Sequence, residues 1–220
     1  MVCWSASAQA APPEVQLQPR VEFWSGGEAF QGIWSIYTGA SFAPFGSVRE
    51  DGVRVRGVAG YADYGNGTVS FADLLVGYHA QLGPLTLKIL AGITAADHAP
   101  DQPLASPRGA GLGAKGVVEA WWNITDRVWT SADLSWGSLE SVYGSRVRLG
   151  WRLWPELSAG LEGGSAGTPD RDIARIGGFV RYEWETGELS ISGGLVIGGP
   201  ASDWQGSPGA FGTVSLLTRF

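Results

Sequence analysis

Short segments in which every second residue is apolar recur along most of this chain. In SRVRLGWRLW (residues 145–154), four apolar residues alternate with three arginines and a glycine. Successive side chains of a β-strand point to opposite faces, so this segment predicts a strand with one apolar and one charged face. The same division recurs in segments 85–93, 111–123, 128–136, 174–184 and 188–197.

Aromatic residues lie near both ends of the apolar faces, and the opposite faces are rich in glycine and carry charges of both signs. One group comprises Trp34, Tyr61 and Trp136, and the other comprises Phe42, Tyr78, Trp122, Trp151, Trp184 and Phe220. Two aromatic girdles around an apolar band, with a polar interior, are typical of a transmembrane β-barrel. A soluble periplasmic β-protein would also alternate and is a rival interpretation, but its minor face would not need this composition.

The alternation predicts an all-β, antiparallel, up-and-down transmembrane barrel of about twelve strands, with ten as the alternative. The expected strands are 21–29, 32–44, 53–64, 69–82, 85–95, 111–123, 128–137, 145–154, 157–165, 173–184, 188–198 and 210–220. Segment 21–29 is the weakest, and we keep it because an even number closes the sheet with no edge in lipid. The stretches ETGE, WPE, NITDR, LGP and GSVREDG are expected as tight periplasmic turns, and longer loops are expected outside.

The two ends of the chain carry signals of their own. Residues 1–20 are expected to be a residual signal peptide or a disordered N-terminus, since Ala8-Gln9-Ala10 has the small-x-small form of a cleavage site. Residues 21–220 are expected to form the barrel. The final strand places Phe220 on the lipid face, where we expect it to act as the C-terminal assembly signal. No run of about 18 apolar residues occurs, so a transmembrane helix is not expected.

The composition of the chain limits which ligands and reactions it can be expected to serve. The net charge of −6 without a basic tail argues against nucleic acid, and the single cysteine, Cys3, offers no disulfide or metal framework. Asp97, His98 and Asp101 could hold Ca²⁺ through oxygen ligands, but a solvated loop is the favoured interpretation. His79 and Asp73 are the one hint of a hydrolase, and six residues along a strand separate them by roughly 20 Å. No cofactor, metal or catalytic residue is therefore predicted.

The inward faces of strands three to twelve are predicted to be basic, with ten basic residues against five acids, a balance of +5. The candidate lumen network consists of Arg54, Arg56, Asp73, Lys88, Lys115, Glu119, Asp133, Arg146, Arg148, Arg152, Glu162, Arg175, Arg181 and Glu183, with Arg219 as the tenth base. Buried charges must be paired, so a packed network of ion pairs is the favoured interpretation. An anion-attracting channel is the alternative. The inward aromatic residues Tyr37, Trp121, Trp129, Phe179 and Phe211 form no definite track in sequence.

Several stretches, in order, resemble the cellulose biosynthesis protein BcsS family of alphaproteobacteria. The most particular are GASFAPFGSVREDGVR and GAKGVVEAWWN, and the resemblance runs from about Phe23 to Phe220. It implies a non-catalytic outer-membrane accessory of cellulose biosynthesis or export, and thereby of exopolysaccharide and biofilm formation, and it supplies no catalytic or binding residues. Expected partners are outer-membrane lipid, the barrel assembly machinery and components of the cellulose synthase complex. A general small-solute or anion-selective pore and a lipid-modifying or hydrolytic enzyme are the alternatives.

Overall fold

The computed structural model describes residues 18–30, 32–64, 67–100, 109–168, 171–198 and 209–220, which form twelve strands and one short 3-10 helix, η1 (Leu139–Ser141). The strands are β1 (Val21–Phe30), β2 (Ile33–Phe42), β3 (Gly52–Asp63), β4 (Gly67–Leu82), β5 (Leu85–Pro100), β6 (Gly109–Asn123), β7 (Val128–Gly137), β8 (Tyr143–Trp154), β9 (Leu157–Thr168), β10 (Arg171–Trp184), β11 (Gly187–Gly198) and β12 (Gly209–Arg219). The predicted cleavage signal and Cys3 lie outside these residues. None of the described residues form a helix with the length and hydropathy of a membrane span.

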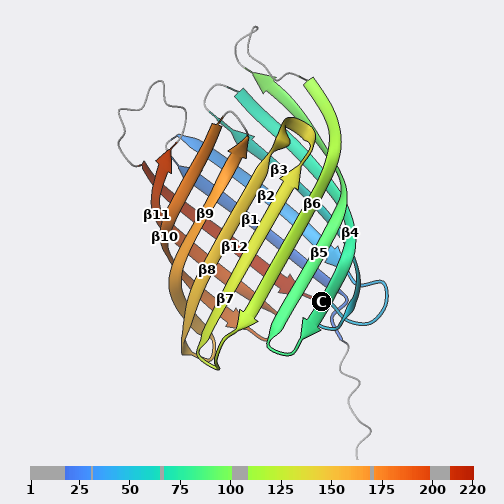
Figure 1. The fold of residues 1–220 in the computed structure, drawn as a ribbon, viewed down its shortest axis with the longest axis vertical. Helices are drawn as coiled ribbons and strands as arrows, with labels where there is room; N and C mark the ends of the chain where they lie inside the picture. The colour runs from blue at the N-terminus through green and yellow to red at the C-terminus, as the bar shows by residue number, and fades with distance from the viewer. Residues whose placement is uncertain (1–17, 31, 65–66, 101–108, 169–170, 199–208) are drawn as a thin grey trace, which may run out of the picture.

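Each strand pairs antiparallel with its neighbours in sequence, and β1 closes the barrel by pairing with β12. Figure 1 shows the tilted strands surrounding a single interior. The register at the seam runs from Glu22 opposite Arg219 to Phe30 opposite Phe211. The prediction of twelve strands, including the weak first segment, is therefore confirmed. Closure pairs the backbone groups that an open edge would leave unsatisfied in lipid.

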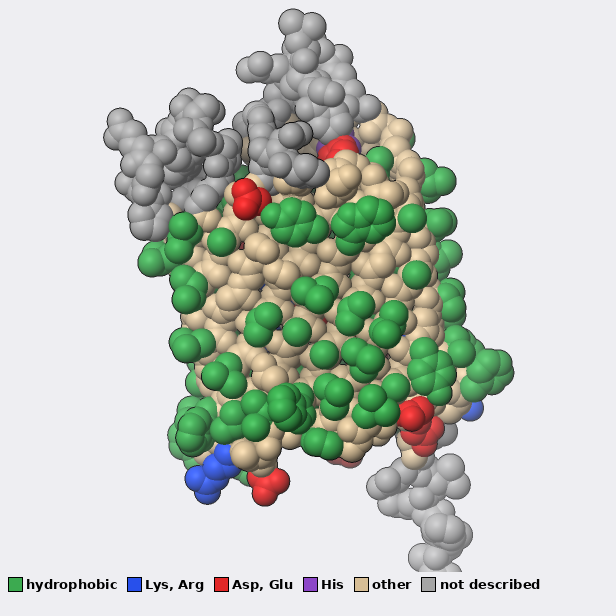
Figure 2. Space-filling view, viewed as in Figure 1, with side chains coloured by type: hydrophobic (Ala, Val, Ile, Leu, Met, Phe, Trp, Pro, Cys, Tyr) green, Lys and Arg blue, Asp and Glu red, His purple; other side chains and the backbone are tan. Residues whose placement is uncertain are grey.

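The exterior is apolar, and the described aromatic side chains of both predicted girdles are exposed or partly exposed on it. On the face shown in Figure 2, hydrophobic side chains are spread over the middle band, and the charged side chains that are visible lie toward its two ends. Trp34 and Tyr61 lie side by side in one girdle, with ring centroids 5.4 Å apart. Rings at these depths can keep one edge in contact with the wet membrane interface.

Four connections of two to four residues lie at the end of the barrel that also holds Arg20 and Phe220. We term it the periplasmic end because outer-membrane barrels have short turns there. Three of them have two residues, at 83–84, 155–156 and 185–186, and 124–127 form a four-residue turn. These four agree with the sequence. The prediction of a tight turn at GSVREDG is wrong, because the nine residues 43–51 separate β2 from β3.

At the other end, the hairpin of β5 and β6 extends beyond its predicted limits. Pairing continues to His98 opposite Gly109, so the prediction that His98 lies in a loop is also wrong. The apolar alternation stops where the strands leave the membrane, whereas backbone pairing continues past that level. A signal based on side chains therefore ends the strands too early.

Candidate functional site

One layer of ion pairs crosses the barrel interior from β12 and β1 to β3. Glu22 on β1 binds Arg219 Nε at 3.1 Å and Lys88 Nζ on β5 at 3.4 Å. Lys88 also lies 3.8 Å from Glu119 on β6, and Glu119 binds both terminal nitrogens of Arg56 on β3, at 2.5 and 2.9 Å. The pairs Glu22–Arg219 and Lys88–Glu119 join neighbouring strands. The pairs Glu22–Lys88 and Arg56–Glu119 join strands that are not neighbours, so this layer spans the lumen as well as lining its wall.

A second cluster is centred on Glu162, which is 1 % exposed. Its carboxylate accepts a hydrogen bond from Arg148 Nε at 2.6 Å and one from Ser192 Oγ at 3.3 Å. Arg175 lies 3.8 Å away and also pairs with Glu28 of β1. Glu162 therefore connects β8, β10 and β11, and Arg175 carries the contact onward to β1.

Two further pairs lie on the β4–β8 side of the barrel. Lys115 on β6 binds Asp73 on β4 at 2.5 Å, across the intervening strand β5. Arg146 and Asp133 face each other on adjacent strands at 3.0 Å, with side chains 32 % and 35 % exposed. This pair is therefore more exposed than the cluster around Glu162.

Aromatic rings fill the interior near the periplasmic end. Trp121 and Trp129 stack with centroids 4.0 Å apart, and Phe179 lies 5.4 Å from Trp129. Trp129 is completely buried, and a Cβ at Gly150 would overlap its ring. The inward glycine thus makes room for the tryptophan, and these rings pack against one another as a plug.

Arg181 covers this plug. Its guanidinium lies 4.5 Å from the centroid of Trp121 and 5.3 Å from that of Trp129. It also binds Glu183 at 2.9 Å and contacts Glu188. Cation–π contacts and two carboxylates together compensate for the burial of this charge.

For strands three to twelve the predicted balance of +5 becomes +4, because Glu188 on β11 also faces the interior and was overlooked. Strand β1, which that count did not cover, adds the inward acids Glu22 and Glu28. Parity along the strand could have identified them. Among the described side chains, ten inward bases therefore face eight inward acids, which leaves +2 (10 − 8). Each of the eight acids has a basic partner, and the two bases without a carboxylate are Arg54 and Arg152. Arg152 near the end of β8 donates to Asn123 Oδ1 at 2.6 Å and to the Asp126 carbonyl at 3.0 Å.

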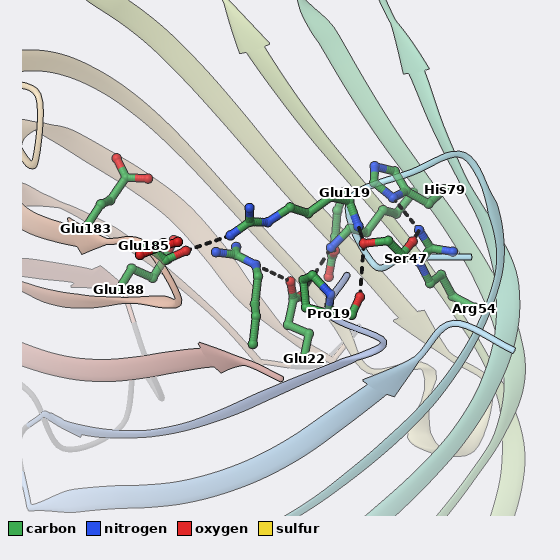
Figure 3. A network of polar contacts seen from close by, with 12 residues as sticks. Pro19, Glu22, Ser47, Arg54, His79, Glu119, Glu183, Glu185 and Glu188 are labelled. Atoms are coloured by element: carbon green, nitrogen blue, oxygen red, sulfur yellow. Dashed lines mark hydrogen bonds and ion pairs between the residues drawn. The ribbon is translucent and has the colours of Figure 1, made fainter. Parts of the chain in front are cut away.

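Arg54 lies beneath residues 43–51, which we term the mouth segment. It is 2 % exposed, and its Nη2 lies 3.0 Å from the Ser47 carbonyl and 2.8 Å from His79 Nδ1. The same nitrogen contacts the Glu50 carbonyl, and Nη1 donates to the Val53 carbonyl at 2.9 Å. Figure 3 shows Arg54 and His79 pointing toward each other beside Ser47. One buried cation thus binds the mouth segment to the wall at β4.

The residues before β1 bind the other side of the mouth segment. Val48 N donates to the Pro19 carbonyl at 2.8 Å, and Ser47 Oγ donates to the same oxygen at 3.0 Å. Ala43 N donates to the Arg20 carbonyl at 2.9 Å. The interior of the mouth segment is buried as a result, whereas Phe45 at its tip is 76 % exposed.

Contacts with other turns hold the mouth segment over the periplasmic end. Arg49 Nη2 donates to the Glu185 carbonyl in the turn between β10 and β11, at 2.6 Å. Gln81 near the end of β4 binds the Arg49 carbonyl at 2.8 Å and the Asp51 carboxylate at 2.6 Å. The segment therefore reaches past β1 and β12 to a distant turn.

The two candidate reactive groups predicted from sequence are not brought together. Asp73 pairs with Lys115, whereas His79 pairs with Arg54. His98 Nε2 lies 3.1 Å from Glu140 in η1, and Asp101 lies outside the described residues. No cluster of three or more metal-ligating side chains occurs among the residues that the structure describes.

The closed sheet, the apolar exterior and the two aromatic girdles define this chain as an outer-membrane β-barrel protein. Over residues 22–220, the sequence matches the family described as cellulose biosynthesis protein BcsS, and the chain belongs to that family. The predicted resemblance is thereby confirmed. Family membership supports an accessory role in cellulose biosynthesis.

Solved porin structures share the fold. The KdgM porin has a TM-score of 0.57 at 11 % identity, covering 90 % of this chain and 99 % of KdgM. A KdgM structure in complex with disordered oligogalacturonate gives the same values. The NanC porin has a TM-score of 0.54 at 8 % identity, covering 91 % of this chain and 99 % of NanC. No curated protein sequence matches this chain.

Proposed function

We propose that this protein serves cellulose biosynthesis as a non-catalytic, closed barrel in the outer membrane and does not conduct the polymer. The observation that carries this proposal is the burial of charges that face the lumen. In a water-filled pore such charges would contact solvent, yet Glu162, Arg148 and Arg56 are buried. The other ion-paired side chains of the interior are at most 35 % exposed. The ion pairs between non-adjacent strands and the tryptophan plug support the same conclusion.

An anion-selective pore is a second candidate, favoured by Arg54 and Arg152, the two bases without a carboxylate. KdgM shows that a barrel of similar fold can be crystallised with an acidic oligosaccharide, in that protein's case oligogalacturonate. In this chain, however, Arg54 is occupied by carbonyls and by His79. An enzyme has less support, because Asp73 and His79 are each held by different partners.

Membrane lipid and the assembly machinery are the further partners that we propose. The apolar exterior with its girdles suits lipid acyl chains and headgroups. Phe220, 71 % exposed beside the seam of β1 and β12, suits recognition during assembly.

Two measurements test the proposal. Cells that lack the protein should deposit less cellulose at their surface, and unchanged deposition would contradict the accessory role. Proteoliposomes that contain the protein should not swell in glucose or cellobiose, with a porin of known permeability as the positive control. Swelling at the rate of the porin would establish the pore instead.

A further inference from the structure

Hydrogen-bond chemistry fixes the protonation state of His79. An arginine guanidinium carries donors and no acceptor, so the close contact with Arg54 Nη2 requires His79 Nδ1 to accept. A histidine that accepts at Nδ1 is neutral and carries its proton on Nε2. In the described residues, Nε2 is buried and has no partner. Nothing at the second nitrogen therefore compensates for a charge on this ring.

Protonation would place a donor on each side of this contact. Charged histidine has N–H groups at both nitrogens, so Nδ1 could no longer accept from Arg54. Two cations would then face each other in a buried setting, where repulsion is poorly screened. His79 is also directly opposite Lys88 on β5.

The acids near His79 already form ion pairs or hydrogen bonds with other groups. Glu22 binds Lys88 and Arg219, and the Asp51 carboxylate accepts from the Gln81 amide. The Glu50 carboxylate accepts from the Ser47 amide at 3.0 Å. A charge on His79 would have to draw one of these acids away from its present partner.

We propose that His79 and Arg54 form a proton-sensitive latch, which holds the mouth segment over the periplasmic end while His79 is neutral and loosens it when His79 is protonated. The guanidinium that faces His79 is the same group that binds the carbonyls of Ser47 and Glu50. Displacing it removes the anchor beneath the segment, whereas the contacts with Pro19 and Gln81 remain. This inference concerns the mouth segment alone and does not depend on the role in cellulose biosynthesis.

Thiol accessibility can test the latch. In a chain with Cys3→Ser, Val48→Cys places a thiol at a site that is 5 % exposed, and Phe45→Cys places one at the exposed tip. A charged methanethiosulfonate labels each thiol, and we divide the labelling rate of Val48→Cys by that of Phe45→Cys. This ratio cancels the effect of pH on thiol reactivity. Between about pH 7.5 and about pH 5, histidine titrates and most carboxylates stay charged. We expect the ratio to rise about tenfold over this range, which corresponds to a tenfold higher proton affinity in the loosened state.

A matched variant separates the latch from general acid effects. In His79→Asn, an amide oxygen replaces Nδ1, so it can accept from Arg54 but cannot be protonated there. We expect a low ratio at both pH values in His79→Asn and a high ratio at both in Arg54→Gln. Heat-modifiable gel migration verifies that each variant forms the barrel. A flat ratio in the parent chain, or a rise that persists in His79→Asn, would overturn the proposal, and this comparison suffices even if Arg54→Gln does not fold.

Discussion

Replacing Glu162 by glutamine tests whether the middle of the barrel is dry. Glu162→Gln keeps the shape of the side chain but removes the charge that faces Arg148 at 2.6 Å and Arg175 at 3.8 Å. The Glu162 side chain has no exposed surface and that of Arg148 is 9 % exposed, so solvent cannot replace the lost partner. Breaking a buried pair from one side costs about 3–5 kcal/mol. At the lower bound, the unfolding equilibrium shifts by a factor of about 150.

Asp133→Asn is the matched control, because the same chemical change is made where the pair is about one-third exposed. Because solvent can partly replace the lost partner there, we expect a loss closer to the about 0–1 kcal/mol of an exposed pair than to that of a buried pair. Urea titration of the barrel in detergent micelles, followed by the heat-modifiable gel band, measures both variants. Adding Arg148→Met to Glu162→Gln should recover part of the loss, because Arg175 still has Glu28. Equal losses in the two single variants would refute the reasoning and indicate water around Glu162.

Three further predictions concern the wall and the end of the barrel. Leu149→Arg, which places a charge on the lipid face, should cost about 2–4 kcal/mol in a bilayer unfolding titration, and a loss no larger than that of Arg146→Gln, an inward change at a pair that is about one-third exposed, would reverse the inside–outside assignment. Phe220→Ala should lower the amount of barrel in the outer membrane more than the stability of what assembles, and an unchanged amount on heat-modifiability gels would contradict a role in assembly. Gly150→Leu should destabilise by about 1–3 kcal/mol through overlap with Trp129, and quenching of the tryptophan by acrylamide should increase, whereas unchanged quenching would argue against the packed plug.

Strand positions and faces could be predicted because they depend on local alternation. The parity of SRVRLGWRLW alone places its arginines inside. The first strand was harder, since VEFWSGGEAF interrupts its pattern with a serine and two glycines. Its inward acids, Glu22 and Glu28, were not part of the predicted charge balance, which covered strands three to twelve. The charge of the whole interior is therefore less positive than that balance.

The partners of the inward charges could not be predicted, because they depend on how closure and strand tilt bring distant strands together. Lys115 is four residues from Glu119 on the same strand face, yet it binds Asp73 on β4. Glu119 instead binds Arg56 on β3. Ion pairs that the sequence suggests between neighbouring strands are found where the two residues lie directly opposite each other, as with Arg146 and Asp133.

The conformation of the mouth segment could not be predicted from the sequence either. Its glycine and charged residues are typical of a surface turn. The contacts that fold it come from the buried Arg54 on β3, and from Pro19 and the turn at Glu185, which are remote in sequence. No local pattern in GSVREDG encodes those contacts.

Planar-bilayer recording of the purified protein tests the closed barrel most directly. With the interior filled by ion pairs and tryptophans, we predict no stable single-channel conductance at neutral pH in either the parent chain or Arg148→Glu. A porin reconstituted in the same lipid provides the positive control. A large, stable conductance in the parent chain would contradict the closed barrel, and anion selectivity that is lost in Arg148→Glu would show that the basic lumen conducts.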